Sequence, residues 1–253
     1  MALLKVSDLT KNFGGLEAVS RLDFHIDEGE ILGMIGPNGA GKTTVFNLIT
    51  GIYPPDSGEI HFNGDSLLGL KPHSITERGI ARTFQTIRVF PNLTVMENVM
   101  AGQHCRARAG LMGAIVRSRS QQQEEESILQ EAQRHLRFMH LWPYRDELSK
   151  NLPYGDQRRL EIARALATDP QLLILDEPAA GLNEQEGREL MDLIDQIRAS
   201  GITVFLIEHD MKVVMGVSDR IVVLDNGEKI AEGTPAEVQV NPRVIEAYLG
   251  REE

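Results

Sequence analysis

The stretch GPNGAGKTT, residues 36–44, decides the fold of this 253-residue chain. It fits the pattern GxxxxGK followed by Ser or Thr, whose glycines let the backbone wrap closely around an anion so that successive N–H groups converge on it. The apolar run ILGMIG (31–36) leads into the stretch, and the apolar run VFNLIT (45–50) follows it. This order predicts a buried strand, a tight loop and a helix whose positive N-terminal end faces phosphate groups.

Each residue of this phosphate loop is a candidate contact of a nucleoside triphosphate. Lys42 places a positive charge at the β- and γ-phosphates, and the hydroxyl of Thr43 is suited to ligate Mg²⁺. The predicted nucleotide-binding residues of the loop are Gly36, Pro37, Asn38, Gly39, Ala40, Gly41, Lys42, Thr43 and Thr44.

A second candidate element is LLILDEP, residues 172–178. Asp176 ends an apolar run, and a buried carboxylate is costly unless it meets a cation, a need that Mg²⁺ fulfils. Glu177 follows directly and is placed to orient or deprotonate a water that attacks the γ-phosphate. Together with the phosphate loop, this element predicts a P-loop NTPase. The sequence has no NKxD motif for reading guanine, which argues against a GTPase.

The remaining pattern predicts an α/β fold. The apolar runs ILGMIG, LLILD (172–176) and ITVFLIE (202–208) each precede turn residues and a helical pattern, which indicates βα units around a mostly parallel sheet. Near the N-terminus, LLKVSDL (3–9), LDFHID (22–27) and GEIHFNG (58–64) alternate apolar and polar residues, which predicts a flanking antiparallel layer. From about Met96 to about Ser149 the pattern is helical.

Composition narrows the function classes. The formal net charge of −11 argues against nucleic-acid binding, because affinity for a phosphate backbone comes from clustered Lys and Arg. No apolar run approaches the roughly 18 residues of a membrane span, so work at a membrane would go through partner proteins. Cys105 is the single cysteine, which fits a reducing compartment. A basic patch (Arg106, Arg108, Arg117 and Arg119) is either a solvated helical face or a docking surface.

The segment LPYGDQRRLEIARAL, residues 152–166, opens from a turn onto a helix, with Asp156 near its first turn. Such a start is either an ordinary helix start or one that faces an anion.

Five segments in order resemble the motifs of the ATP-binding cassette family over essentially the whole chain. They are GPNGAGKTT, RTFQ with Gln85, LPYGDQRRLEIARAL, LLILDEPAAGLN and LIEHD with His209. The wording of FGGLEAV (13–19) and of RTFQTIRVFPNLTVMENV (82–99) is most similar to the ATP-binding subunits of bacterial branched-chain amino acid importers. The resemblance implies one cassette domain, in which residues 1–95 and 168–253 form a RecA-like core with the antiparallel layer, and about 96–167 form a helical signature subdomain.

The resemblance also implies that two cassettes dimerise head to tail and enclose two ATP molecules. Each ATP would lie between one subunit's phosphate loop and the other subunit's signature residues, here Pro153, Tyr154, Gly155 and Asp156. Pro153 stands where the family's usual serine donates a hydrogen bond to the γ-phosphate, so one donor is lost. Because an acidic side chain opposes phosphate binding, we expect Asp156 to point away from the γ-phosphate or toward the ribose.

Single positions carry over from the family's motifs. Phe13 matches the aromatic residue that stacks on adenine, and His209 matches the residue that closes the γ-phosphate side. Gln85 matches the residue that links Mg²⁺ or the lytic water to the transporter interface. The predicted catalytic residues are thus Lys42, Gln85, Glu177 and His209, and the predicted Mg²⁺ ligands are Thr43, Gln85 and Asp176. Asn183 stands where the family often has Asp, which weakens the inference of contacts across the dimer there.

The implied function is ATP hydrolysis that powers import. The implied partners are a second cassette, identical or paralogous, two membrane permease subunits and, indirectly, a substrate-binding protein outside the membrane. The expected location is the cytoplasmic face of the cell membrane. Two alternatives stay open: the same ATPase serving another cargo, such as urea, another amino acid or lipopolysaccharide export, and a non-transport cassette acting as a switch. A catalytically dead regulator is disfavoured, because Lys42, Asp176, Glu177 and His209 are all present.

Overall fold

The computed structural model describes residues 2–103 and 119–249. Cys105 and the arginines at 106, 108 and 117 lie outside the described residues, and nothing is described of the Arg119 side chain. The chain divides into two compact units: residues 1–75 with 171–253, and residues 76–170. The division that the sequence places at residue 96 falls inside the second unit, and the one at 167 falls near its end.

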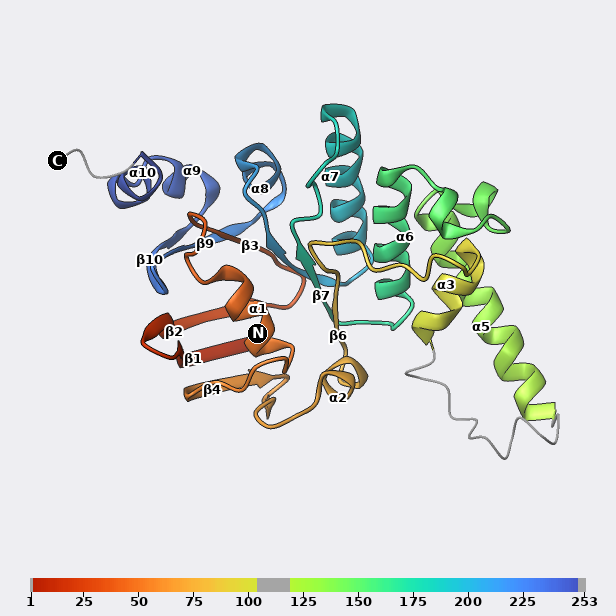
Figure 1. Cartoon of the computed structure of the whole chain (residues 1–253), viewed down its shortest axis with the longest axis horizontal. Coiled ribbons are helices and arrows are strands. Elements are labelled where there is room, and N and C mark those ends of the chain that lie inside the picture. Colours follow the sequence, from red (N-terminus) through yellow and green to blue (C-terminus); the bar gives the residue numbers. More distant parts are fainter. Residues whose placement is uncertain (1, 104–118, 250–253) are drawn as a thin grey trace. The chain divides into compact units, whose positions relative to one another are not determined.

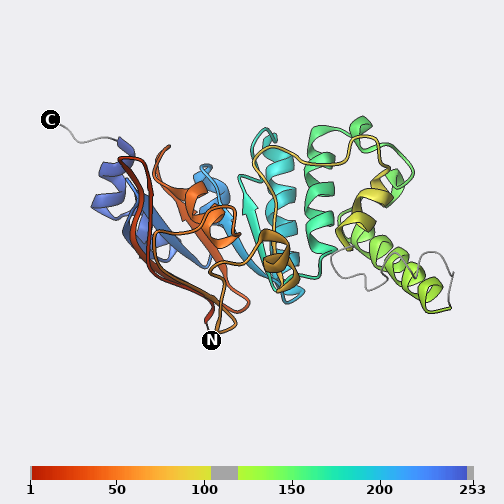
Figure 2. The ribbon, with the colours of Figure 1, turned by 60° about the horizontal axis from the view of Figure 1, so that its bottom comes forward.

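The first unit begins with an antiparallel layer in the strand order β2-β1-β4-β5. Its strands are β1 (Ala2–Phe13), β2 (Leu16–Asp27), β4 (Ser57–Phe62) and β5 (Asp65–Ser66). β1 and β2 run side by side as long, curved strands (Figure 2). Leu4, Val6 and Leu9 of β1 are buried, because one face of the layer packs on the core while the other faces water.

The same unit contains a second sheet, in which the order β10-β9-β3-β8-β7 places β3 between β9 and β8. Its strands are β3 (Ile31–Ile35), β7 (Leu172–Asp176), β8 (Thr203–Ile207), β9 (Arg220–Asp225) and β10 (Glu228–Gly233). All pairings among them are parallel except that of β9 with β10. Every residue of β3, β7 and β8 is buried, which explains why these strands read as continuous apolar runs.

Helices of the first unit flank this sheet (Figure 1). They are α1 (Lys42–Ile49), α7 (Glu184–Ala199), α8 (Met211–Val217), α9 (Pro235–Gln239) and α10 (Pro242–Leu249). The Phe46 ring of α1 lies 4.7 Å from that of Phe205 on β8, which lies 5.6 Å from that of Phe24 on β2. These rings join α1, the parallel sheet and the antiparallel layer in one core. The predicted fold class, a mostly parallel sheet with an antiparallel layer and helices, is confirmed.

The second unit is largely helical. It contains β6 (Ile80–Arg82), α3 (Val95–Gly102), α5 (Arg119–Phe138), α6 (Tyr154–Leu166) and short 3-10 turns at Trp142–Tyr144 and Ser149–Asn151. α2 (Pro72–Glu77) crosses the boundary between the units. α3 packs tightly on α6, because a Cβ at Gly102 would lie 2.3 Å from the carbonyl oxygen of Arg164. No helix in the described ranges is long and apolar enough to cross a membrane.

Candidate functional site

The carboxyl ends of three adjacent parallel strands meet at one edge of the first unit's sheet. β8 lies between β3 and β7, with Ile207 paired to Met34 on one side and to Asp176 on the other. The phosphate loop follows β3, Glu177 follows β7, and His209 comes two residues after β8. In open α/β sheets, ligands bind beyond the carboxyl ends of the strands. The structure therefore brings Lys42, Asp176, Glu177 and His209 to the same edge.

The phosphate loop needs its glycines. Gly41 has φ 102°, and a Cβ there would lie 2.4 Å from the carbonyl oxygen of Ala18. Gly36 has φ 152°, and a Cβ there would lie 2.1 Å from the carbonyl oxygen of Leu224. At both positions a neighbouring segment of backbone lies too close to admit any side chain. Glycine at these positions therefore allows the tightly wrapped loop that the motif requires.

Lys42 lies over this loop. Its Nζ donates to the carbonyl oxygens of Gly36 at 2.6 Å and Pro37 at 3.0 Å, and the side chain is buried. Loss of hydration lowers the pKa of Lys42, while the charges of Glu177 and Asp176 act in the opposite direction. A partly desolvated ammonium held by carbonyls gains from any anion that replaces lost water.

The first turn of α1 is open to an anion. No described side chain caps this helix, whose N-cap is Gly41, and its first turn has no acidic residue. By contrast, Asn183 caps α7 and Thr234 caps α9, each with a glutamate in the first turn. The amides that begin α1 and their dipole are thus directed at whatever lies in the loop. This arrangement fits phosphate. Asn183 stands where the family often has Asp, and here its side chain caps the N-terminus of α7.

Asp176 and Thr43 offer hard oxygen ligands suited to Mg²⁺. The Asp176 side chain is buried at the end of β7, whereas Thr43, in the first turn of α1, is exposed. Within the described residues there is no group of three or more His, Cys, Asp or Glu that could hold a metal ion. Mg²⁺ commonly binds through one or two carboxylates plus substrate phosphates and water, so a sparse set of this kind suits it.

Glu177 and His209 face each other. His209 Nδ1 lies 3.6 Å from Glu177 Oε2 and 3.8 Å from Glu208 Oε2. Glu177 has φ 48°, a left-handed conformation that is uncommon for a residue other than glycine. Such strain concentrates at functional sites, where the surrounding structure holds it in place.

Glu208 is a residue that sequence reasoning missed. It is fully buried, and its carboxylate accepts hydrogen bonds from three backbone amides: Ala179 at 2.6 Å, His209 at 3.1 Å and Asp210 at 3.4 Å. Burial raises the pKa of Glu208, and these hydrogen bonds act against that rise. Glu208 thereby ties the segment after β7 to the segment after β8. The signal was available, because Glu208 follows a buried strand just as Glu177 does.

Phe13 presents a partly exposed ring at the end of β1. The ring is 39% exposed and lies 5.3 Å from the ring of Tyr53 in an edge-to-face contact. Lys11 Nζ lies 5.5 Å from the Phe13 centroid. The ring is thus partly exposed, and its stacking on adenine stays a prediction. Tyr53 belongs to none of the sequence motifs, so its contact with Phe13 was not predicted from the sequence.

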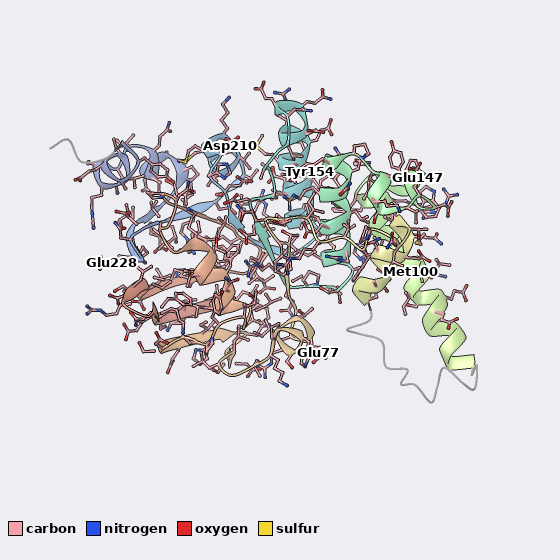
Figure 3. All side chains as sticks on the ribbon, viewed as in Figure 1. Glu77, Met100, Glu147, Tyr154, Asp210 and Glu228 are labelled. Atoms are coloured by element: carbon pink, nitrogen blue, oxygen red, sulfur yellow. The ribbon has the colours of Figure 1, made fainter. Side chains whose placement is uncertain are left out.

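The other predicted site residues belong to the second unit. Gln85 lies in the loop after β6 with its side chain exposed, and its carbonyl oxygen accepts a hydrogen bond from Arg158 Nη2 at 2.9 Å. α6 begins at Tyr154 with Pro153 as its N-cap residue (Figure 3). Asp156 pairs along this helix with Arg159, Oδ1 to Nη1 at 3.6 Å. The place of Gln85 and residues 153–156 at a nucleotide stays a prediction.

Comparison with known proteins gives consistent matches. The family model "ABC transporter" matches residues 19–180, and the model "Branched-chain amino acid ATP-binding cassette transporter" matches residues 228–253. The chain is 47% identical to the high-affinity branched-chain amino acid transport ATP-binding protein LivG of Salmonella typhimurium (strain LT2), over 98% of each chain.

Solved structures agree with these matches. The ADP conformation of MJ1267, an ATP-binding cassette of an ABC transporter, has a TM-score of 0.86 at 30% identity, covering 99% of this chain and 100% of that one. A dimeric post-hydrolysis state of the cassette MJ0796, bound to ADP and Pi, has a TM-score of 0.77 at 27% identity, covering 92% of this chain and 98% of that one.

Proposed function

The chain belongs to the ABC transporter family as an ATP-hydrolysing cassette, and from this premise we propose that it powers the import of branched-chain amino acids. The observation that carries the proposal is that four candidate catalytic side chains lie at one sheet edge in a chain with near-full-length similarity to LivG. Lys42, Asp176, Glu177 and His209 lie at one edge of one sheet. The C-terminal match over residues 228–253 is to the branched-chain amino acid group.

The proposed nucleotide is ATP, bound by backbone N–H groups of the loop of residues 36–44, in which only Pro37 lacks one. Lys42 neutralises the β- and γ-phosphates, in exchange for its present contacts with the carbonyl oxygens of Gly36 and Pro37. The ring of Phe13 stacks on adenine, which its exposure supports. Thr44, half-buried in the first turn of α1, adds a hydroxyl on the phosphate side.

Catalysis is assigned to Glu177, which orients and deprotonates the attacking water. His209, 3.6 Å away, holds the γ-phosphate side and keeps the Glu177 carboxylate in place. Thr43, Asp176 and Gln85 are the proposed Mg²⁺ ligands, and the ion would neutralise charge that develops on the phosphate oxygens. Most of the rate enhancement would then come from positioning and electrostatic stabilisation.

A second cassette completes the proposed site. The residues Pro153, Tyr154, Gly155 and Asp156 would lie at the γ-phosphate of the neighbouring subunit, with the N–H groups of Tyr154, Gly155 and Asp156 at the start of α6 directed at it. Two observations support this. No described side chain caps α6, and Asp156 is paired with Arg159, which offsets its negative charge. The related cassette MJ0796 is dimeric in a post-hydrolysis state bound to ADP and Pi, which supports a pairing of two cassettes.

The proposed membrane partner docks on the second unit. A cavity of about 430 Å³ lies there, lined by Phe84, Arg88, Phe90, Glu161 and Arg164 among others. Arg88 lies over the Phe84 ring at 4.1 Å, and Arg164 over the Phe90 ring at 5.2 Å, so the walls are aromatic and cationic together. Such a surface suits a short helix of a permease subunit. Two such subunits would hold the cassette pair at the cytoplasmic face of the membrane, and a substrate-binding protein would act from the other side.

Deleting the encoding gene in its source organism tests the cargo. We expect uptake of labelled leucine to fall and to be restored by the parental chain, but not by Glu177→Gln, which should still bind ATP. Unchanged leucine uptake together with lost urea uptake would overturn the cargo assignment and leave the ATPase assignment intact. Crosslinks from residues 89–95 that reach only soluble proteins would overturn the membrane partner.

A further inference from the structure

α6 carries two charged side chains, inside the segment LPYGDQRRLEIARAL, to which no nucleotide contact is assigned. Arg158 and Glu161 are each 1% exposed, and Arg158 Nη1 donates to Glu161 Oε2 at 3.0 Å. Removing two charges from water is costly, and their mutual attraction offsets that cost only when further hydrogen bonds complete both groups. The hydrogen-bond partners of this buried pair, which satisfy all but the Nε of Arg158, indicate what it does.

Those partners are backbone groups of one loop, on both sides of Gln85. Arg158 Nη1 donates to the carbonyl oxygen of Phe84 at 2.7 Å, and Nη2 to that of Gln85 at 2.9 Å. Glu161 Oε1 accepts from the amides of Phe84 at 3.3 Å and Arg88 at 3.2 Å. Two carbonyls and two amides of residues 84–88 are therefore bonded to one turn of α6.

The far end of the loop is fastened as well. The amide of Phe90 donates to Asn98 Oδ1 at 2.8 Å, and the carbonyl oxygen of Phe90 accepts from Asn98 Nδ2 at 3.1 Å. The Ser149 hydroxyl donates to the same carbonyl at 2.8 Å. By contrast, the side chains of Gln85, Arg88 and Phe90 are exposed. The loop thus has a backbone fixed by hydrogen bonds and side chains that reach the surface.

A surface loop does not need this buried pair to satisfy its backbone, because water serves exposed amides and carbonyls. A buried ion pair is also weak evidence for stability, since apolar side chains of similar volume often serve as well. Fixing the position of one segment against another is the best-attested use of such pairs. The planar, forked guanidinium suits two neighbouring carbonyls in a way that an ammonium does not.

We propose that Arg158 and Glu161 are positioning residues that make the 84–88 backbone and α6 move as one body. A displacement of the signature end, at residues 153–156, is then transmitted directly to Gln85. The reverse also holds: an occupant of the cavity that touches Phe84 and Arg88 acts on α6 through the same hydrogen bonds. This inference rests on the proposed function, which assigns the nucleotide to the signature end and the permease to the cavity.

Three variants of the full chain test the buried pair. Arg158→Gln removes the fork, Arg158→Lys keeps the charge without it, and the double change Arg158→Met with Glu161→Leu replaces the pair by apolar side chains that preserve packing. Arg134→Gln is the matched control. Arg134 also pairs with a glutamate three residues away, Glu131, at 2.6 Å, but on α5 and with its side chain 66% exposed.

The first measurement is amide hydrogen exchange by mass spectrometry on peptides covering residues 82–92. We expect exchange at Phe84 and Arg88 to quicken about tenfold or more in the double variant, which removes the Glu161 carboxylate that accepts from both amides. Arg158→Gln removes only the fork that donates to the loop carbonyls and the charge that faces Glu161, so exchange should quicken less in that variant. Exchange in β7 should stay parental, which shows that the fold is intact. The exchange rate of Arg158→Lys should lie between those of the parent and Arg158→Gln, and that of Arg134→Gln should match the parent.

The second measurement is steady-state ATP hydrolysis by the same variants. A misplaced Gln85 should lower kcat about tenfold while KM for ATP stays within about twofold, because the phosphate loop is untouched. Parental exchange and parental kcat in the folded double variant would overturn the inference. A parental chain that hydrolyses ATP but never crosslinks to a permease would instead overturn the membrane partner, and the exchange result would still decide the role of the buried pair.

Discussion

His209 Nδ1 lies 3.6 Å from Glu177 Oε2, across the ends of two neighbouring parallel strands. The backbone sets up this contact. The amide of Glu177 donates to the carbonyl oxygen of Ile207 at 2.8 Å, so the residue after β7 is held at the end of β8. The Glu208 carboxylate then accepts hydrogen bonds from the amides of Ala179 and His209. The pair that we assign to catalysis is thus positioned by hydrogen bonds to the main chain, as preorganised sites require.

Glu177→Gln should separate ATP binding from ATP turnover. The amide keeps the size and the hydrogen-bonding reach of the carboxylate, but it cannot take a proton from water. We expect hydrolysis to fall by about 100-fold or more, with ATP affinity kept and a closed dimer accumulating. Phosphate release and size-exclusion chromatography with MgATP measure both effects. Turnover at the parental rate, or a strictly monomeric variant, would contradict the assigned role.

Glu208→Gln should weaken both the fold and the catalytic edge. A side-chain amide has one acceptor oxygen where the carboxylate has two, so at least one of the three N–H donors loses its partner. We expect the free energy of unfolding to fall by about 1–3 kcal/mol, and kcat to fall as His209 and Glu177 lose their alignment. Urea denaturation and ATPase assays measure these. Glu228→Gln, at an exposed position of β10 (Figure 3), is the control and should change neither.

The sequence predicts the parallel core and the positions of the phosphate loop and of Asp176 and Glu177 at strand ends, for a local reason. A strand buried on both faces leaves a continuous apolar run, and the phosphate loop and Asp176–Glu177 each follow such a run directly. The adjacency of β7 and β8 is a different matter. It is a pairing between segments distant in the chain, and only the resemblance to a family assigns His209 to the γ-phosphate side, where Glu177 is expected.

The buried pair on α6 shows what local patterns leave out. Arg158 and Glu161 lie among other charged residues in a helix whose sequence pattern is typical of a partly exposed helix. That pattern does not predict that these two side chains are buried. Their partners are main-chain groups of the loop at 84–88, whose sequence has no bearing on a hydrogen bond to a carbonyl or an amide. A contact between a side chain and a distant backbone leaves no residue pattern to read.

Val244→Ala tests the packing of the C-terminal helix against the strand that precedes the phosphate loop. Val244 of α10 is 5% exposed and belongs to a buried cluster with Ile35, Val223 and Val238. Its truncation removes two methyl groups and leaves a cavity. The free energy of unfolding should fall by about 1–2 kcal/mol. The neighbouring Ile245 is 44% exposed, so Ile245→Ala is the control and should change stability much less. Equal losses for the two variants would place α10 outside the core.

His135 should make the stability of the protein sensitive to mild acid. It is buried on α5, and loss of hydration, followed by the charge of Arg134, lowers its pKa from 6.5 to about 4. In the unfolded chain His135 takes up a proton near pH 6.5, whereas in the folded chain it stays neutral until about pH 4. The contribution of neutral His135 to the free energy of unfolding is therefore complete above pH 6.5 and is lost as the pH falls from 6.5 to about 4. Between pH 7 and pH 5 the loss should be about 2 kcal/mol. Urea denaturation at both pH values measures this change in the free energy of unfolding, which should be smaller by about that amount in His135→Gln than in the parent. His140→Gln, a change at an exposed position, is the control and should behave like the parent. The same pH dependence in all three proteins would mean that His135 is not held neutral by the fold.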